Sequence, residues 1–208
     1  TDGPTYCEFS GGAFGYRSGQ PLRRELLARA VGFKGKALSV IDLTAGLGRD
    51  AAVLALLGCD VIAIERNAVV FALLDDGLRR ARSAADTPDA LAERITIVNA
   101  DACEYLEGLD PGMRPDVIYL DPMFPERTHS ALAKKEMRVL AQLVGAEEDG
   151  DRLLRAALAT RCHRVVVKRP LHAPPLAEEA VGAPPLQFRG RSARFDVYFP
   201  DVGVIRAS

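Results

Sequence analysis

The chain has 208 residues, of which 48% are hydrophobic and 26% are charged, and its formal net charge is −1. This length and apolar content predict one α/β domain with a sizeable core. The longest apolar runs are far too short to span a bilayer and no secretory signal precedes the fold, so we expect no membrane segment. The near-neutral charge also excludes a uniformly basic nucleic-acid-binding protein.

The cysteines and histidines predict a cytoplasmic protein without a bound metal. The four cysteines form no Cys-x-x-Cys pair, which suits a reducing cytosol. The three histidines show no spacing typical of metal ligands.

The N-terminal part of the chain differs from the rest. Residues 1–20 are glycine-rich and contain four aromatic side chains, and we expect them to form a short β segment or a flap. The stretch from Pro21 to about Val31 predicts a helix. We therefore divide the chain into an N-terminal arm and helix, 1–36, and one main domain, 37–208.

A glycine turn follows the first predicted strand. Residues 38–50 read Leu-Ser-Val-Ile-Asp-Leu-Thr-Ala-Gly-Leu-Gly-Arg-Asp, which predicts a buried strand, a tight turn and the start of an apolar helix. Gly46 and Gly48 let the backbone approach a ligand closely, and the helix N-terminus adds oriented N–H groups. The next strand, 60–65, ends in Glu65, 19 residues after Gly46. An acid at that distance meets ribose hydroxyls in nucleotide-binding βαβ units, so the pattern predicts a bound nucleoside.

Three residues help to distinguish a dinucleotide from S-adenosylmethionine. Ala51 stands where the dinucleotide fingerprint has its third glycine, although alanine is sometimes allowed there. A carboxylate at Asp42, beside the glycine turn, would repel a pyrophosphate but not a cationic sulfonium. Asp101 ends the third predicted strand, 95–101, where it accepts from an adenine amino group, caps a helix at 102–107, or does both. These residues favour S-adenosylmethionine.

The most informative stretch is 116–125, Asp-Val-Ile-Tyr-Leu-Asp-Pro-Met-Phe-Pro. An apolar strand ends here in a stiff turn at the edge where open α/β sheets bind ligands. The Asp121 carboxylate and the Pro122 carbonyl can accept the two N–H bonds of an amino group on a planar heterocycle, and Phe124 can stack on its face. By itself the motif also fits an ordinary strand-ending turn.

Sequence periodicity predicts the other elements. They are helices at about 49–57, 67–83, 88–92, 130–143 and 151–159, a strand at 164–168, a Pro/Ala-rich connection at 171–184, and a β-hairpin at 185–190 and 194–200.

From about Phe14 to Phe199 the chain resembles the class I S-adenosylmethionine-dependent methyltransferases, and more narrowly the RsmJ family of bacterial 16S rRNA guanine-N2 methyltransferases. The strings that carry the resemblance are Asp42–Asp50, Glu65–Asn67, Leu73–Leu78, Tyr119–Pro125, Lys134–Arg138 and Val165–Pro170. The resemblance implies a Rossmann-like α/β fold, in which a seven-stranded, mostly parallel sheet has an antiparallel last strand. It also implies S-adenosyl-L-methionine as cofactor, S-adenosyl-L-homocysteine as product, and 16S rRNA or the 30S subunit as partner.

The resemblance also implies which residues contact the cofactor. Carried over by position, they are Arg49, Asp50, Glu65, Arg66, Asp101, Ala102 and Asp121. We add Asp42, Gly46 and Gly48 from the strand and turn that contain them.

The charge distribution suggests where RNA phosphates bind. Residues 37–120 hold seven basic and fourteen acidic residues, whereas the rest of the chain holds twenty and fourteen. A localised basic patch is what phosphate contacts need. The candidate phosphate contacts are Arg127, Lys134, Lys135, Arg138, Lys168 and Arg169, with Arg189, Arg191 and Arg194 as a possible extension. For Lys168, a salt bridge or an exposed strand end is an equal alternative, and solvated helix faces compete for any single lysine.

The favoured function is methyl transfer to the N2 of a guanosine in 16S rRNA. The Asp-Pro-Met-Phe turn does not distinguish guanine N2 from another amino target, such as adenine N6 in RNA or DNA. A non-catalytic RNA-binding assembly factor on the same fold is a further alternative. A nicotinamide oxidoreductase is disfavoured by Ala51, Asp42 and the lack of a candidate proton donor. The sequence predicts no oligomeric state.

Overall fold

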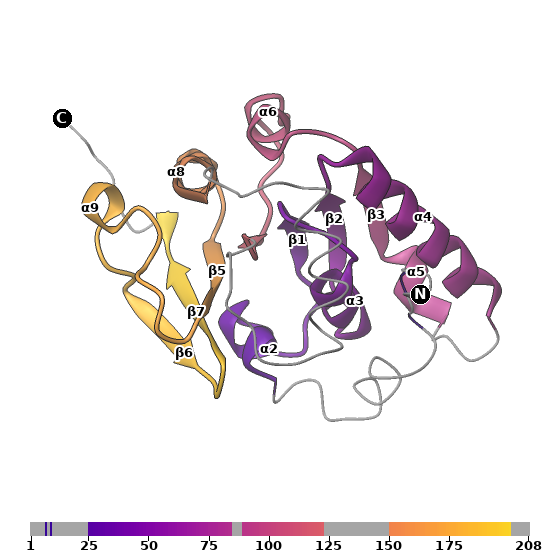
Figure 1. Ribbon diagram of the computed structural model, residues 1–208, viewed down its shortest axis with the longest axis horizontal. Coiled ribbons are helices and arrows are strands. Elements are labelled where there is room, and N and C mark those ends of the chain that lie inside the picture. Colours follow the sequence, from indigo (N-terminus) through magenta and orange to yellow (C-terminus); the bar gives the residue numbers. More distant parts are fainter. Residues whose placement is uncertain (1–6, 8, 10–24, 85–88, 123–149, 201–208) are drawn as a thin grey trace, which may run out of the picture.

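A seven-stranded sheet forms the centre of the protein in the computed structural model, which describes residues 7, 9, 25–84, 89–122 and 150–200 (Figure 1). The strands are β1 Ser39–Asp42, β2 Asp60–Ile64, β3 Ile95–Val98, β4 Val117–Leu120, β5 Arg164–Pro170, β6 Leu186–Arg189 and β7 Ala193–Tyr198. Their order in the sheet is β3-β2-β1-β4-β5-β7-β6.

The pairing of the strands confirms the predicted mixed sheet. Strands β1 to β5 run parallel, and β7 runs antiparallel to both β5 and β6. The strand order reverses at β1, which has β2 on one side and β4 on the other. In open α/β sheets, ligands bind beside the carboxyl ends of the strands at such a reversal. The glycine turn and Asp121 follow those two strands directly, so the topology brings them together.

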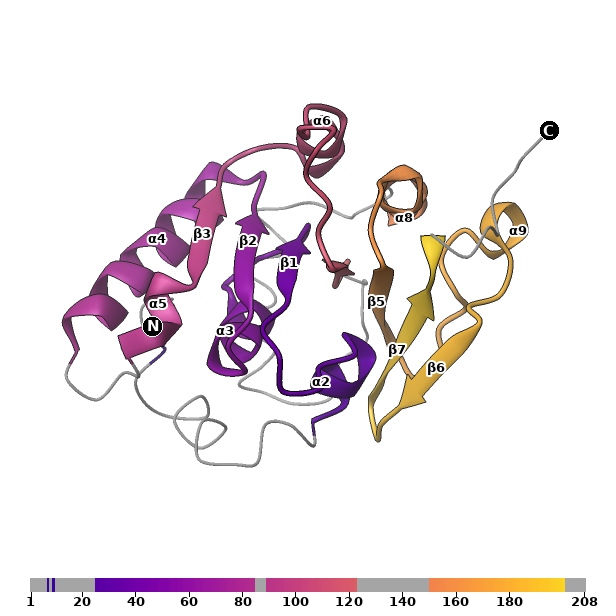
Figure 2. The ribbon, with the colours of Figure 1, turned by 180° about the vertical axis from the view of Figure 1, so that it is seen from behind.

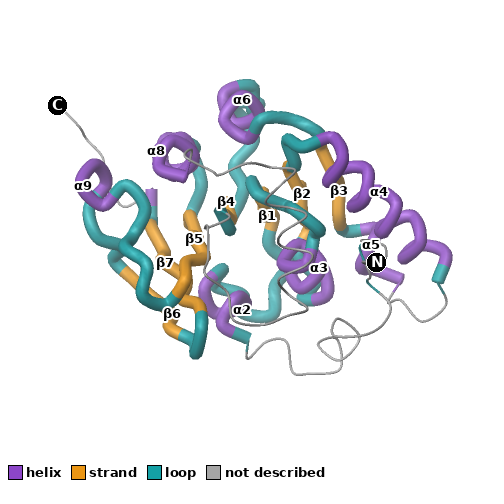
Figure 3. The backbone as a smooth tube through the Cα atoms, viewed as in Figure 1, coloured by secondary structure: helices purple, strands orange, loops and turns teal. Residues whose placement is uncertain are grey.

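Helices cover both faces of the sheet, as Figure 1 and the tube in Figure 3 show. They are α2 Leu26–Ala30, α3 Arg49–Leu56, α4 Ala68–Ser83, α5 Asp89–Glu93, α6 Ala102–Glu107, α8 Gly150–Ala159 and α9 Glu178–Val181. In Figure 1, α6, α8 and α9 lie along the upper side of the sheet and α2 and α3 along the lower side. The view from behind in Figure 2 shows the same two layers.

Alternation along the strands divides the core between these two layers. In β4, Val117 and Tyr119 point into the core formed with α2 to α5, whereas Ile118 and Leu120 point into the core formed with α6 and α8. Successive side chains of a strand point to opposite faces, so a parallel strand buried on both faces is apolar throughout. All four residues of β4 are buried, as the unbroken run Val-Ile-Tyr-Leu predicts.

Several predicted boundaries differ from the structure. The helix predicted from Pro21 to about Val31 is not continuous, because Glu25 has extended backbone and α2 begins at Leu26. The third strand ends at Val98 rather than at Asp101, because Asp101 caps α6 by accepting from the N–H groups of Cys103 (2.9 Å) and Glu104 (3.1 Å). The connection at 171–184 contains the short helix α9, which its proline content concealed. The helix predicted at 130–143 lies outside the described residues.

Two described residues of the N-terminal arm are buried against the main domain. Cys7 and Phe9 are 2% and 3% exposed. They approach α4 at Gly77, where an added Cβ would lie 2.5 Å from the Cβ of Cys7. The missing side chain of Gly77 therefore allows the arm to dock on this helix. The rest of the predicted β segment or flap lies outside the described part of the chain.

Candidate active site

The two glycines of the turn between β1 and α3 have different structural roles. Both have positive φ, 53° at Gly46 and 72° at Gly48, which other residues adopt only with strain. A Cβ on Gly48 would lie 2.5 Å from Cδ1 of Leu74, so this glycine allows the turn to pack against α4. A Cβ on Gly46 would meet nothing closer than the Thr44 carbonyl oxygen at 4.0 Å. Gly46 therefore presents its backbone to open space.

Glu65 lies beside this turn at the carboxyl end of β2. Its carboxylate accepts from the backbone N–H of Gly46 (3.0 Å) and from that of Asn67 (2.8 Å). Burial raises the pKa of Glu65, and the two backbone hydrogen bonds oppose that rise. The structure thus joins the two residues whose 19-residue spacing predicts a nucleoside site.

Asn99 is a residue of this region that the sequence analysis missed. Its side-chain amide donates to the carbonyl oxygens of Glu65 (2.7 Å) and Arg66 (3.2 Å). It thereby ties the end of β3 to the end of β2. A polar residue directly after an apolar strand is the signal that would have identified Asn99.

Asp42 is buried at the end of β1 and is 1% exposed. Its Oδ1 accepts from the backbone N–H of Thr44 (3.1 Å). Burial is the main cause that raises the pKa of Asp42 to about 8, and the nearby acids Asp50 and Asp121 add to it. At neutral pH the side chain is therefore mostly uncharged. The expectation that a charged Asp42 repels a pyrophosphate is therefore wrong. The acidic groups that can carry charge beside the turn are Asp50 and Asp121.

Lys168 joins two of these acids. Its Nζ lies 2.8 Å from Oδ2 of Asp50 and 2.8 Å from Oδ2 of Asp121. Burial acts to lower the pKa of Lys168, but the two carboxylates outweigh burial and raise it, so the ammonium stays charged. The hydroxyl of Tyr119 donates to the same Oδ2 of Asp50 at 2.6 Å. Burial and the same carboxylates raise the pKa of Tyr119, which keeps it a neutral donor.

These side chains form what we call the acidic cluster. Its members are Asp42, Asp50, Tyr119, Asp121 and Lys168.

Thr44 connects the acidic cluster to the glycine turn. Its hydroxyl oxygen accepts from the backbone N–H of Asp121 at 2.6 Å. The turn after β4 is thus fixed against the turn after β1, although the two residues are 77 positions apart. Nothing in the sequence around Thr44 distinguishes it from an ordinary turn residue.

Comparison with known proteins gives the family. A family model described as "SAM-dependent methyltransferase" matches residues 1–200. The ribosomal RNA small subunit methyltransferase J of Thioalkalivibrio sulfidiphilus is 52% identical over 198 residues, which cover 94% of this chain and 76% of that protein. The protein of the same name from Edwardsiella ictaluri is 50% identical over 200 residues, which cover 95% and 78%. The chain belongs to the ribosomal RNA small subunit methyltransferase J family.

Solved structures agree with this family. A SAM-dependent methyltransferase from Neisseria gonorrhoeae has 38% identity and a TM-score of 0.74, and the match covers 96% of this chain and 76% of that one. The rRNA methyltransferase aviRa from Streptomyces viridochromogenes, at 20% identity and a TM-score of 0.55, covers 93% and 92%. At that identity the second match shows the class I methyltransferase fold alone.

Family membership makes S-adenosyl-L-methionine the cofactor, and the site fits it. Gly46 leaves open space beside its backbone, and Glu65 is held next to it. Glu65 can accept from ribose hydroxyls. Asp50 and Asp121 supply negative charge for a sulfonium cation.

The remaining predicted cofactor residues follow the carboxyl ends of β1, β2 and β3 along the chain. Arg49 is exposed as the first residue of α3, and Arg66 is exposed directly after Glu65. Asp101 and Ala102 lie at the start of α6, where Asp101 acts as its N-cap. Pro122 is buried directly after Asp121. Phe124, Arg127, Lys134, Lys135 and Arg138 are outside the described residues.

The prediction that two arginines lie on the surface and contact RNA is wrong. Arg169 is 2% exposed and donates through Nε (3.1 Å) and Nη2 (2.7 Å) to the carbonyl oxygen of Pro174. Arg194 is 3% exposed and pairs with Asp196. Both guanidinium groups are buried and bind protein acceptors, so neither is placed to meet a phosphate.

The described part of the chain has neither a cluster of metal ligands nor a membrane-spanning helix. The described residues contain no group of three or more His, Cys, Asp or Glu side chains that could hold a metal ion. None of their helices has both the length and the apolar character needed to cross a bilayer.

Proposed function

We propose that this protein transfers a methyl group from S-adenosyl-L-methionine to the exocyclic N2 of a guanosine in 16S rRNA, as free RNA or within the 30S subunit, in the cytoplasm. The observation that carries the proposal is the position of Asp121. It directly follows β4 beside the glycine turn and is tied to Thr44 and to Lys168. The chain that contains it is about half identical to small-subunit rRNA methyltransferases.

In this proposal, hydrogen-bond acceptors beside the substrate amino group orient it for methyl transfer. The lone pair of guanine N2 is delocalised into the ring, so N2 is a weak nucleophile. The Asp121 carboxylate and the Pro122 carbonyl accept its two hydrogens and aim the lone pair at the methyl carbon. The bound cofactor supplies an electrophilic methyl group on a sulfonium.

The carboxylate has a second role as the carbon–nitrogen bond forms and the methyl carbon–sulfur bond breaks, with S-adenosyl-L-homocysteine as the leaving group. Positive charge develops on N2, and the Asp121 carboxylate stabilises it. The surplus N2 proton then passes to Asp121. Lys168, held by Asp50, orients the Asp121 carboxylate before the substrate arrives. Because the ammonium is shared between two acids, it orients Asp121 without neutralising the whole site.

The other expected contacts belong to the same proposal. Glu65 binds the ribose and Asp101 the adenine amino group, and Phe124 stacks on an unpaired or flipped-out target base. Further cofactor contacts are Arg49, Asp50, Arg66 and Ala102. RNA phosphates bind Arg127, Lys134, Lys135 and Arg138. The arm 1–36 precedes a methyltransferase domain at 37–208.

Labelled methyl transfer tests the proposed function. Purified 16S rRNA and 30S subunits from cells that lack this gene are incubated with the protein and labelled S-adenosylmethionine, and the product nucleoside is identified by mass. N2-methylguanosine supports the proposal, and the form that accepts label identifies the substrate. Label in N6-methyladenosine, or no label despite tight cofactor binding, contradicts it.

A further inference from the structure

A second pocket opens at the same edge of the sheet as the acidic cluster. It has a volume of about 450 Å³ and lies between the turn after β5, helix α9 and the end of β6. Both β5 and β6 end at the edge where Asp121 lies, because both pair antiparallel with β7 and β5 runs parallel to β4. Its lining includes His172, Ala173, Glu178, Gln187, Arg189 and Arg194.

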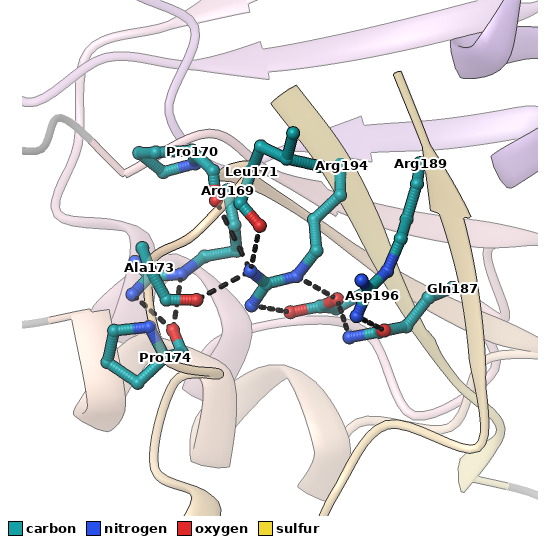
Figure 4. Close-up of polar contacts among 9 residues, drawn as sticks. All are labelled: Arg169, Pro170, Leu171, Ala173, Pro174, Gln187, Arg189, Arg194 and Asp196. Carbon is teal, nitrogen blue, oxygen red and sulfur yellow. Dashed lines mark hydrogen bonds and ion pairs between the residues drawn. The ribbon is translucent and has the colours of Figure 1, made fainter. Parts of the chain in front are cut away.

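Buried charged side chains fix the wall of this pocket (Figure 4). Arg194 donates to Asp196 through Nε (2.8 Å) and Nη2 (3.0 Å). Its Nη1 donates to three carbonyl oxygens, of Pro170 (3.2 Å), Leu171 (3.0 Å) and Ala173 (2.5 Å). A buried ion pair is weak evidence for stability, but it specifies one arrangement of the groups around it. Here it specifies the path of the turn after β5.

We call this group the arginine cluster. Its members are Arg169, Arg194 and Asp196.

The arginine cluster also orients an exposed arginine at the rim of the pocket. Gln187 donates to Oδ1 of Asp196 at 2.7 Å, and Arg189 donates through Nη2 to Oε1 of Gln187 at 3.0 Å. The guanidinium carries five N–H donors, and the contact with Gln187 uses one of them. Arg189 is thus an exposed cation held in position from the buried Asp196, as Figure 4 shows.

We propose that this pocket binds one unpaired nucleotide of the RNA substrate, close to the methylated base. This inference rests on the proposed function. The Arg189 fork matches the oxygens of a phosphodiester. The exposed imidazole of His172 offers a surface on which a base stacks, and the Glu178 carboxylate accepts from base N–H groups. Unpaired bases with accessible edges are what proteins recognise in RNA.

The position of the pocket relative to the acidic cluster suits a neighbouring nucleotide. Leu171 continues the extended chain after β5, since its N–H donates to Ser192 at 3.0 Å. Leu171 lies three residue steps along the chain from Lys168, which corresponds to about 10 Å in extended backbone. Lys168 and Arg169 point to opposite faces of β5, so the RNA strand crosses the carboxyl end of that strand between the two sites.

The test compares two exposed arginines at opposite edges of the sheet. Arg189→Gln removes the proposed phosphate contact, and Arg161→Gln changes an exposed arginine that precedes β5 at the amino edge. Binding of 16S rRNA to the full chain is measured from about 50 to about 200 mM salt. We expect Arg189→Gln to weaken binding about tenfold and to reduce the slope of log K against log salt by about 0.7. Arg161→Gln should change neither.

A second variant tests the stacking surface. His172→Ala should weaken RNA binding about fivefold or more without changing the salt slope, because stacking involves no phosphate charge. In all three variants, cofactor affinity and melting temperature should match those of the parent protein, since the side chains of Arg161, His172 and Arg189 are exposed.

The two proposals fail in different ways. Equal affinity and equal slope for Arg189→Gln and Arg161→Gln overturn the nucleotide pocket, even if the parent protein methylates 16S rRNA. Absence of methylation by the parent protein overturns the proposed function, and with it the identity of the bound RNA.

Discussion

The acidic cluster and the arginine cluster both place charged side chains at the carboxyl edge of the sheet, but they use them differently. In the acidic cluster, Lys168 shares one ammonium between two carboxylates, and its side chain and that of Asp121 are 29% and 39% exposed. In the arginine cluster, the side chains of Arg194 and Asp196 are 4% and 1% exposed and form a bidentate pair. The first cluster is open to a ligand, and the second is enclosed by protein.

This difference indicates which charged side chains contact the substrate and which fix the conformation of the protein. A carboxylate that shares its cation and keeps contact with solvent can exchange partners when a substrate binds. A pair whose donors also bind backbone carbonyls cannot do so without unfolding its surroundings. Substitutions of Asp121 and Lys168 in the acidic cluster should therefore change activity, whereas those in the arginine cluster should change stability.

The largest expected effect is at Asp121. Asp121→Ala should lower methyl transfer by on the order of 10³-fold or more, because it removes an acceptor of the substrate amino group. Cofactor affinity, measured by calorimetry, should fall by no more than about tenfold, because Asp121 supplies only part of the charge that attracts the sulfonium and Glu65 and the glycine turn are unchanged. Asp110→Ala, an exposed acid in the turn before β4, is the matched control. A normal rate for Asp121→Ala would rule out the proposed mechanism.

The second-largest expected effect is on stability, at the ion pair of the arginine cluster. Arg194→Met should lower the free energy of unfolding by about 3–5 kcal/mol, because Asp196 is left buried without its cation. Urea unfolding followed by circular dichroism gives this value. The double variant Arg194→Met/Asp196→Leu should recover part of the loss, since no charge stays buried. If the single variant unfolds like the parent protein, the pair does not fix this end of the sheet.

Substitution of Lys168 distinguishes a role in positioning Asp121 from a direct contact with RNA. Lys168→Met should lower kcat by about 10- to 100-fold, because the Asp121 carboxylate loses the group that orients it. The salt slope of RNA binding should not change, since the ammonium is held by Asp50 and Asp121. A fall of the slope by about 0.7 would instead show that Lys168 binds a phosphate.

The smallest effect concerns Asp42 and depends on pH. Its pKa is about 8 in the folded protein, above the ordinary value of 3.8. A raised folded pKa favours folding at low pH, and that contribution is lost as the pH rises from about 4 to about 8. Asp42→Asn carries no titrating group at this position, so its stability relative to the parent should increase between pH 6 and pH 8 by about 2 kcal/mol. Urea unfolding at both pH values measures the difference, and a constant difference would contradict a buried neutral Asp42.

The sequence by itself determined the elements and the chemistry that they carry. Alternating and unbroken apolar runs predicted every strand, because a sheet covered on both faces needs buried side chains on both. The glycine turn, Glu65 and the Asp-Pro turn were visible because their spacing along one βαβ unit is fixed by the unit itself. The resemblance of long strings then predicted the family that the comparisons show.

Only the tertiary structure decided the partners of the charged side chains. Lys168 meets Asp50 and Asp121 across separations of 118 and 47 residues, which no local pattern encodes. The basic pair Lys168-Arg169 looked like one surface feature in the sequence. Neighbouring residues of a strand point to opposite faces. Lys168 therefore lies in the acidic cluster, whereas Arg169 is buried on the other face of the sheet.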